Sequence, residues 1–447
     1  MKRAVSLCCA ALGAAAPAVA SAQSDWSVHG LIATLSGWTD NLALAPADDD
    51  PATPEPVSDF FFNLRPGLLV SRATPRTIFD LSYEFQADLN VDHSEANDYS
   101  HRLQWRGFVR PGPRSTVVAS VAAAMGDTGA LVIATDPTQP DTDFLPPADQ
   151  TFIRLEATEA LRYDLSETWR LGQTAAANRA ETRQDDALAT RSHDAELAVT
   201  ADRVWPRQTL GARAAGRFIQ LESPGVFDGA SRQVETTVEA TFQRDFDEHW
   251  SGQAFAGASW LAPLDERAAA GVFPVARIGA FYRHDIGFGS ALLAREVVPV
   301  LFAAQTAVTE SASLNLGKPL PWLADDPSEP VLFLAARGAL GRTRVVAGDG
   351  DDTGWTTALV DGGVFYTNRD PRLSIGLRYS FQHRSSDAVG VGDYRSHTVM
   401  LTVAAMVPAR PAGVVPIRGS VRVDESDVPP PTDVAEAGAA GGDAPAQ

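Results

Sequence analysis

A strict two-residue alternation of apolar and polar side chains constrains the fold of this chain more than any other feature. From Phe79 to Val91 every second residue is apolar, and the residues between them are Asp, Ser, Glu, Gln, Asp and Asn. Successive side chains of a β-strand point to opposite faces, so this segment predicts a strand with one apolar and one strongly polar face. The same period returns within 102–110, 234–243 and 372–382.

The length of these runs separates a membrane barrel from a soluble β protein, which also alternates. Soluble strands usually have about 5 or 6 residues, whereas runs of about 10 to 15 match a tilted strand that crosses a bilayer. No stretch after Gln23 provides the roughly 18 uncharged apolar residues of a membrane helix. The alternation is blurred in Leu292–Ala304 and Val117–Met125, where both faces are apolar. We therefore favour a membrane barrel, with a soluble β protein as the alternative.

The connections between predicted strands alternate between short and long, as the periplasmic turns and outer loops of outer-membrane barrels do. Short turns are predicted at Ala73–Arg76, Pro111–Arg114, Ser166–Thr168, Pro206–Gln208, Asp247–His249, Ile286–Gly289 and Asp370–Pro371. Long loops are predicted at Asp40–Val57, Asp92–Asp98, Gly129–Asp149, Gln184–His193, Gly225–Ser231, Asp265–Gly271, Gly348–Thr353 and Ser385–Gly392. Two connections depart from the alternation: Ala304–Thr309 is predicted as a short outer loop and Trp322–Glu329 as a long inner turn.

Together these segments predict an all-β protein, a transmembrane antiparallel up-and-down β-barrel of about 18 strands, with 16 to 20 acceptable. The barrel is assigned to residues 23–408. Residues 409–447 are rich in Pro, Gly and Ala. Such a composition buries little apolar surface, so this segment is predicted to be a flexible, disordered periplasmic tail.

Residues 1–22 have the pattern of a cleavable signal peptide. Lys2 and Arg3 form a basic start, an apolar run follows, and Ala20-Ser21-Ala22 matches the small-x-small cleavage pattern. A transmembrane anchor is the alternative. Removal of the two positive charges would change the formal net charge from −19 to −21. We expect an exported protein of the Gram-negative outer membrane.

Composition and motifs argue against several other functions. The net charge of −19 disfavours nucleic-acid binding, because the phosphate backbone must be neutralised by Lys and Arg. The two cysteines, Cys8 and Cys9, lie inside the signal segment, and the chain has no HExxH or GxSxG motif. Gly348–Asp352 resembles half of a calcium loop but is interpreted as a solvated loop. No enzyme activity, metal site or cofactor is predicted.

Charged residues on the polar phase of the strands are predicted to face the lumen, because an arginine on the lipid face would cost about 2 to 4 kcal/mol at the bilayer midplane. The predicted pore-lining residues are Asp80, Glu84, Asp88, Arg102, Arg106, Arg110, Arg154, Glu156, Glu235, Glu239, Arg277 and Arg378. They could line a passage for a hydrophilic solute. They could equally brace a polar interior.

Two of these groups form rows on neighbouring predicted strands. The acidic row is Asp80, Glu84 and Asp88, and the basic row is Arg102, Arg106 and Arg110. Such rows can line a constriction, or they can pair and close it. The sequence leaves both possibilities open.

The start of the predicted barrel resembles a known group of proteins. Trp38-Thr39-Asp40-Asn41, an acidic Pro-rich loop, and the segment Ser58–Leu68 look like the opening hairpin of outer-membrane barrels associated with exopolysaccharide export. Some members of that group resemble 18-stranded secretion pores. The resemblance implies passage of a polar glycan and a periplasmic polysaccharide-export protein as partner. It implies no catalytic residue.

Three functions remain open at this stage. The first is an outer-membrane pore for a hydrophilic polymer, chiefly secreted exopolysaccharide. The second is a general or solute-specific porin, in which Gly129–Asp149 would fold inward as the constriction loop. The third is a structural or adhesive barrel with a closed lumen. In each case the expected surroundings are outer-membrane lipid and lipopolysaccharide, with a glycan or small solute as cargo for the first two.

Overall fold

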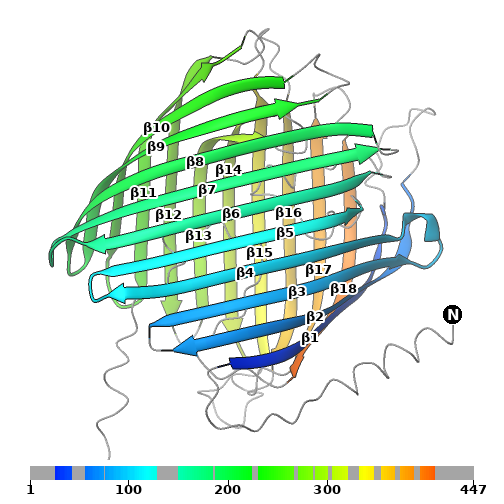
Figure 1. Cartoon of the computed structure of the whole chain (residues 1–447). Helices are drawn as coiled ribbons and strands as arrows, with labels where there is room; N and C mark the ends of the chain where they lie inside the picture. Colours follow the sequence, from blue (N-terminus) through cyan, green and yellow to red (C-terminus); the bar gives the residue numbers. More distant parts are fainter. Residues whose placement is uncertain are drawn as a thin grey trace, which may run out of the picture.

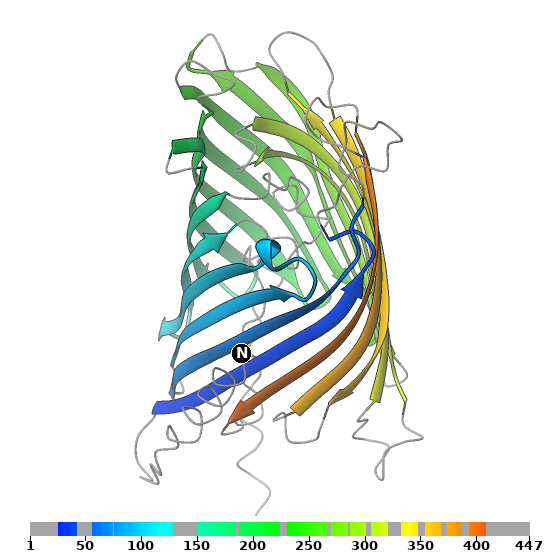
Figure 2. The same ribbon diagram turned by 90° about the vertical axis from the view of Figure 1, so that its right-hand side faces the viewer.

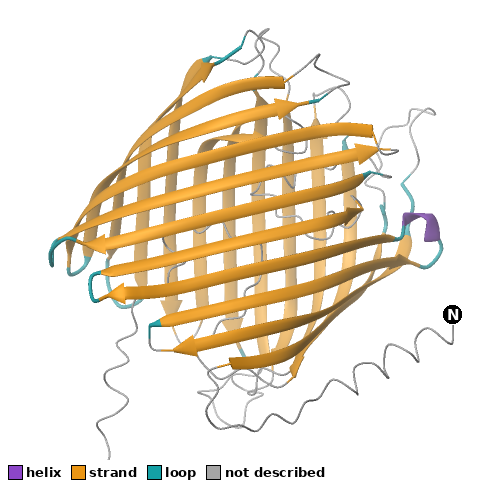
Figure 3. Ribbon diagram, in the orientation of Figure 1, coloured by secondary structure: helices purple, strands orange, loops and turns teal. Residues whose placement is uncertain are grey.

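The computed structural model forms one closed β-barrel. The residues that it describes are 26–42, 56–74, 76–127, 150–184, 187–223, 230–265, 270–284, 287–300, 305–320, 332–346, 354–367, 373–386 and 393–407. Almost all of them belong to strands, apart from turns and a short 3-10 helix at Ser94–Ala96 (Figure 3). The predicted signal segment, tail and constriction loop Gly129–Asp149 lie outside the described residues.

The described residues contain 18 strands, as predicted. The first nine are β1 Trp26–Thr39, β2 Asp59–Thr74, β3 Thr77–Asn90, β4 Asp98–Gly112, β5 Ser115–Asp127, β6 Thr151–Asp164, β7 Trp169–Gln184, β8 Ala187–Trp205 and β9 Gln208–Glu222. The second nine are β10 Ala230–Asp245, β11 Trp250–Pro263, β12 Gly271–His284, β13 Gly287–Val300, β14 Gln305–Pro319, β15 Leu332–Val345, β16 Gly354–Thr367, β17 Leu373–Ser386 and β18 Tyr394–Val407.

Each strand pairs antiparallel with its neighbours in sequence, and β1 also pairs with β18 from Gly30↔Val407 to Thr39↔Thr398, which closes the ring. The strands are tilted around the ring (Figure 1). β1 begins and β18 ends at the same end of the barrel (Figure 2). We call this the turn end and the opposite end, where most of the longer connections leave, the loop end.

The two faces of the wall differ in polarity as the alternation predicts. Outward-facing apolar side chains are widely exposed, for example Leu103 at 47% and Leu197 at 54%. On β3, Tyr83 is 42% exposed, while Asp80 on the opposite face is 4% exposed. Lipid chains offer no hydrogen-bonding partner, so a surface in contact with them must carry few polar groups. The apolar outward face meets this requirement. The closed all-β barrel fold is confirmed.

Several connections lie where the sequence placed them, and others do not. The turns predicted at Ser166–Thr168 and Asp247–His249 fall between consecutive strands, and the turn predicted at Pro206–Gln208 overlaps the first residue of β9. The long loop predicted at Gln184–His193 is wrong, because β7 runs to Gln184 and β8 already starts at Ala187. Polar residues there prompted the loop prediction, but they continue the ladder after a register shift at Thr182/Arg183.

The predicted short loop at Ala304–Thr309 is also misplaced, because β14 begins at Gln305. This part of the chain leaves the wall. β13 pairs with β12 only as far as Ala276↔Arg295, whereas β13 and β14 stay paired up to Val300↔Gln305. Figure 2 shows the loop-end segments of this yellow-green hairpin bent towards the barrel interior.

The hairpin tip packs against the inside of the wall on both of its faces. Val297 and Val308 form a buried cluster with Leu261 of β11 and Val275 of β12. On the other side Val300 and Ala307 form a second cluster with Trp355 of β16. Burial on both faces explains why alternation is lost at Val297–Val300, since neither face of this segment meets water or lipid.

One polar contact shows that the tip reaches a strand that is not its neighbour in the ring. The Gln233 side chain on β10 donates a hydrogen bond to Thr306 Oγ1 on β14. Three strands separate β10 from β14 in the ring. The hairpin therefore lies inside the barrel and narrows it from the side formed by β10–β16.

We expect Leu261→Ala to lower the free energy of unfolding by about 2–5 kcal/mol, because it removes a fully buried side chain beneath the hairpin. Denaturant unfolding of the refolded barrel measures this change. Leu264→Ala is the control, since Leu264 is 58% exposed and its loss should cost at most about 0.5 kcal/mol. Equal effects of the two variants would contradict the packing described for the hairpin.

Candidate functional site: the lumen face

The predicted pore-lining residues lie on the lumen-directed phase of their strands, with one exception. Cross-strand pairs Asp80↔Arg106 and Glu84↔Arg102 place the acidic and basic rows on one face. Arg110 is the exception, because it lies within the register shift between Val109 and Gly112, where strand phase does not assign a face, and it is exposed at the turn end. Their role in lining a pore stays a prediction.

Neutral donors hold the two outer members of the acidic row. Ser71 on β2 donates a hydrogen bond to Asp80. Asp88 accepts hydrogen bonds from Asn63 Nδ2, also on β2, and from Gln86 Nε2 at 2.7 Å. Both carboxylates are almost fully buried, and these contacts replace part of the hydration that they lose.

The middle of the two rows is different. Glu84, Arg102 and Arg106 are half-buried, and none of them forms an ion pair or hydrogen bond with another described residue. Direct cross-strand neighbours of opposite charge thus face the lumen without closing on each other. Within the described chain, the β3–β4 wall therefore presents charged groups that a polar solute could contact.

The opposite arrangement occurs on β8–β10, where the lumen charges neutralise one another. Arg213 on β9 forms ion pairs with Glu196 on β8 and with Glu239 on β10, the latter at 3.0 Å. Arg217, also on β9, pairs with Asp194 on β8 at 2.7 Å. Two arginines spaced by four residues on one strand thus join three strands into a braced wall.

Glu235, which the sequence also predicted in the lumen, is not bound by an arginine at close range. It accepts hydrogen bonds from Ser259 Oγ at 2.6 Å and from Thr237 Oγ1 at 3.2 Å, and it is 6% exposed. The remaining predicted residues have local acid or base partners. The pairs are Arg154 with Glu156, Arg277 with Glu296, and Arg378 with Asp361.

Sequence reasoning missed both braces on β9, Arg213 and Arg217. The segment Gly211–Ile219 carries Ala or Gly on both phases, so it shows no apolar–polar alternation. The four-residue spacing of Arg213 and Arg217 could have indicated them, because residues four apart share one face of a strand. Glu196 and Glu239 on the neighbouring strands supply the negative charges that pair with Arg213.

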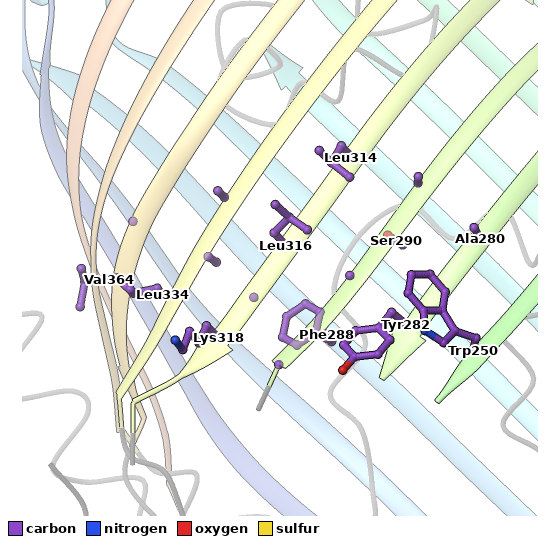
Figure 4. A pocket seen from close by; sticks show the side chains of 17 residues that line it. Trp250, Ala280, Tyr282, Phe288, Ser290, Leu314, Leu316, Lys318, Leu334 and Val364 are labelled. Atoms are coloured by element: carbon purple, nitrogen blue, oxygen red, sulfur yellow. The ribbon is translucent and has the colours of Figure 1, made fainter. Parts of the chain in front are cut away.

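An apolar pocket of about 680 Å³ lies on the outward face near the turn end. Trp250, Tyr282, Leu314, Leu316 and Leu334, from β11, β12, β14 and β15, are among its lining residues (Figure 4). Their phase is that of the exposed apolar band, so the pocket faces the surroundings of the barrel. It is separate from the charged lumen wall.

The described residues lack two further features. They contain no group of three or more His, Cys, Asp or Glu side chains arranged to hold a metal ion. They also contain no helix with the length and hydropathy to cross a membrane.

No family model and no curated protein matches this chain. Solved structures match over most of its length. The FrpB iron transporter of Neisseria meningitidis is 9% identical, with 86% of this chain and 82% of that chain covered and a TM-score of 0.48. OccAB3 of Acinetobacter baumannii is 11% identical, with 85% and 99% covered and a TM-score of 0.44. The siderophore receptor PirA of Pseudomonas aeruginosa is 12% identical, with 84% and 80% covered and a TM-score of 0.41.

We expect Arg217→Ala to destabilise the barrel by about 3–5 kcal/mol, because it leaves the buried Asp194 carboxylate without its charged partner. Arg102→Ala should change the unfolding free energy by at most about 0.5 kcal/mol, since Arg102 has no such pair. Denaturant unfolding in the same detergent compares the two. A similar loss of unfolding free energy at both positions would mean that the ion pairs of β8–β10 add no stability over the unpaired charges of β3–β4.

Proposed function

We propose that this protein is an outer-membrane channel through which a hydrophilic solute passes. The observation that carries the proposal is the charged lumen face of a closed ring whose outward face is apolar. Glu84, Arg102 and Arg106 supply charged groups on that lumen face that are not neutralised by described partners. Groups of this kind replace part of the hydration of a polar solute and lower the cost of its entry.

The proposed location follows from the same asymmetry of the wall. Strands that are apolar outside and charged inside match a barrel in a bilayer, and the predicted signal peptide 1–22 would export the chain. With both described ends at the turn end, that end would face the periplasm and the loop end would face outwards. The predicted tail 409–447 would then be available to a periplasmic partner.

Within this function we favour secreted exopolysaccharide as the cargo. Sugar hydroxyls both donate and accept hydrogen bonds, so a wall that presents guanidinium and carboxylate groups side by side suits a glycan. The resemblance of the opening hairpin to export-associated barrels supports the same cargo. The hairpin of β13 and β14 would restrict passage from one side, beside the β10–β16 wall.

A general or solute-specific porin is the second candidate, and the same unpaired charges favour it. It differs in its cargo and in requiring no periplasmic partner, and it predicts no dependence of surface glycan on this protein. A structural or adhesive barrel, the third possibility, requires a lumen that does not conduct.

We expect the purified protein to conduct ions in planar bilayers, and the double variant Arg102→Glu/Arg106→Glu to shift the reversal potential towards cation selectivity. Reversing two positive charges in the wall changes the local field in that direction. Arg203→Glu is a matched control, since Arg203 lies on the outward phase of β8. An unchanged reversal potential would remove the β3–β4 wall from the permeation path.

Deletion of the gene should lower surface polysaccharide and raise retained polysaccharide, and complementation should restore both. The Arg102→Glu/Arg106→Glu variant should restore less, because the altered wall would bind the glycan differently. Quantifying cell-surface and cell-retained sugar tests this expectation. Unchanged glycan together with measurable conductance would favour the porin, and the absence of conductance would favour the structural barrel.

A further inference from the structure

Charged side chains lie on the outward face at the loop end of β7–β9, where the rest of the face is apolar. Cross-strand pairing of Arg179↔His193 and Glu181↔Arg191 places these residues on the phase of Leu197, which is 54% exposed. Arg191↔Glu222 extends the group to β9. We call Arg179, Glu181, Arg183, Arg191 and Glu222 the β7–β9 arginine cluster.

Glu181 is the centre of this cluster. Its side chain is 1% exposed and is contacted by three guanidinium groups. Arg179 Nη2 lies 2.8 Å from Oε2, Arg183 Nη2 lies 2.6 Å from Oε1, and Arg191 Nε lies 3.2 Å from Oε2. One buried carboxylate therefore fixes three long side chains that would otherwise move freely.

The arginines keep donors that the cluster does not use. Among the described residues, Arg179 Nη1, Arg183 Nη1 and Arg191 Nη2 have no hydrogen-bond partner, and neither does the buried Arg179 Nε. The three side chains are 43%, 46% and 31% exposed, respectively. The five described residues of the cluster are three arginines and two glutamates.

The cluster lies immediately beyond the apolar band. Arg179 is the cross-strand neighbour of Leu155 on β6, which is 44% exposed, and Leu197 lies only two outward positions below His193. In the proposed orientation this level is the boundary between acyl chains and headgroups of the outer leaflet. An outward-facing charge at this depth can contact a headgroup without entering the hydrocarbon.

We propose that the β7–β9 arginine cluster binds the phosphate groups of lipopolysaccharide in the outer leaflet. A guanidinium group matches phosphate with two parallel donors, and arginines held in advance by Glu181 lose less conformational entropy on binding. The proposal rests on the outer-membrane location given above, but it is independent of what the lumen transports.

A second outward group also has one glutamate between arginines. Glu310 on β14 forms ion pairs with Arg295 on β13 and with Arg344 on β15, the latter at 3.4 Å. Arg344 is 37% exposed. Two sites on well-separated strands, each with one glutamate that gathers several arginines, fit a ring of anionic headgroups around the barrel better than one local stabilising network.

The test is a titration of the full-length mature protein in detergent with bisphosphorylated lipid A and with dephosphorylated lipid A. We expect binding of the phosphorylated form, and at least about tenfold weaker binding by Arg179→Gln/Arg183→Gln, since two charge-assisted contacts are lost. Arg183→Lys keeps the charge but not the paired donors, so its affinity for phosphorylated lipid A should lie between those of the wild type and the double variant. Millimolar inorganic phosphate should not displace the lipid.

Arg203→Gln is the control, because it removes the same charge from the outward face of β8 at the turn end, where the side chain stacks on Trp205 at 5.0 Å. It should bind lipid A like the wild type. Equal binding of both lipid forms, or equal loss in the control, would overturn the proposal. If the double variant did not refold, the lipid A titration of Arg183→Gln alone would test the proposal, because this side chain is exposed and its replacement should not prevent folding. Because ion conductance is measured separately, failure here leaves the channel proposal to its own test.

Discussion

The closed ladder of backbone hydrogen bonds is the constraint on which the rest of this structure depends. A strand in lipid cannot leave its N–H and C=O groups unpaired, and the pairing of β1 with β18 removes the two edges that an open sheet would have. Closure also gives every strand one face towards the axis and one away from it. The charged lumen and the apolar surround are therefore two consequences of a single ring.

The ring departs from this rule at one place, and a side chain compensates. Where β13 separates from β12 beyond Ala276↔Arg295, the Pro274 carbonyl loses its place in the ladder between these two strands. Arg295 Nε donates a hydrogen bond to that carbonyl at 3.1 Å. The same arginine pairs with Glu310, so one side chain satisfies the backbone and joins the two strands that turn inward. The inward hairpin is thus accommodated without leaving this acceptor unpaired.

Sequence reasoning predicted the barrel because alternation is enforced wherever a strand separates lipid from a polar interior. It succeeded for β3, where Asp80, Glu84 and Asp88 keep one phase. It failed where that condition does not hold. Val297–Val300 of the hairpin is apolar on both faces because both faces are buried, and Arg213 and Arg217 on β9 lie among alanines and glycines. Which charges pair depends on register and side-chain reach, and local sequence specifies neither. The absence of a bond between Glu84 and Arg102, which are direct neighbours, illustrates this.

The position of the inward hairpin also bears on the order in which the barrel assembles. All of its described partners, from Gln233 on β10 to Trp355 on β16, belong to one continuous stretch of chain. None comes from β1 or β18. The hairpin can therefore settle against its own part of the wall while the first and last strands are still apart, and the seam can be joined afterwards without trapping it outside. These contacts span fewer residues than the pairing of β1 with β18, so less chain entropy is lost in forming them than in closing the seam.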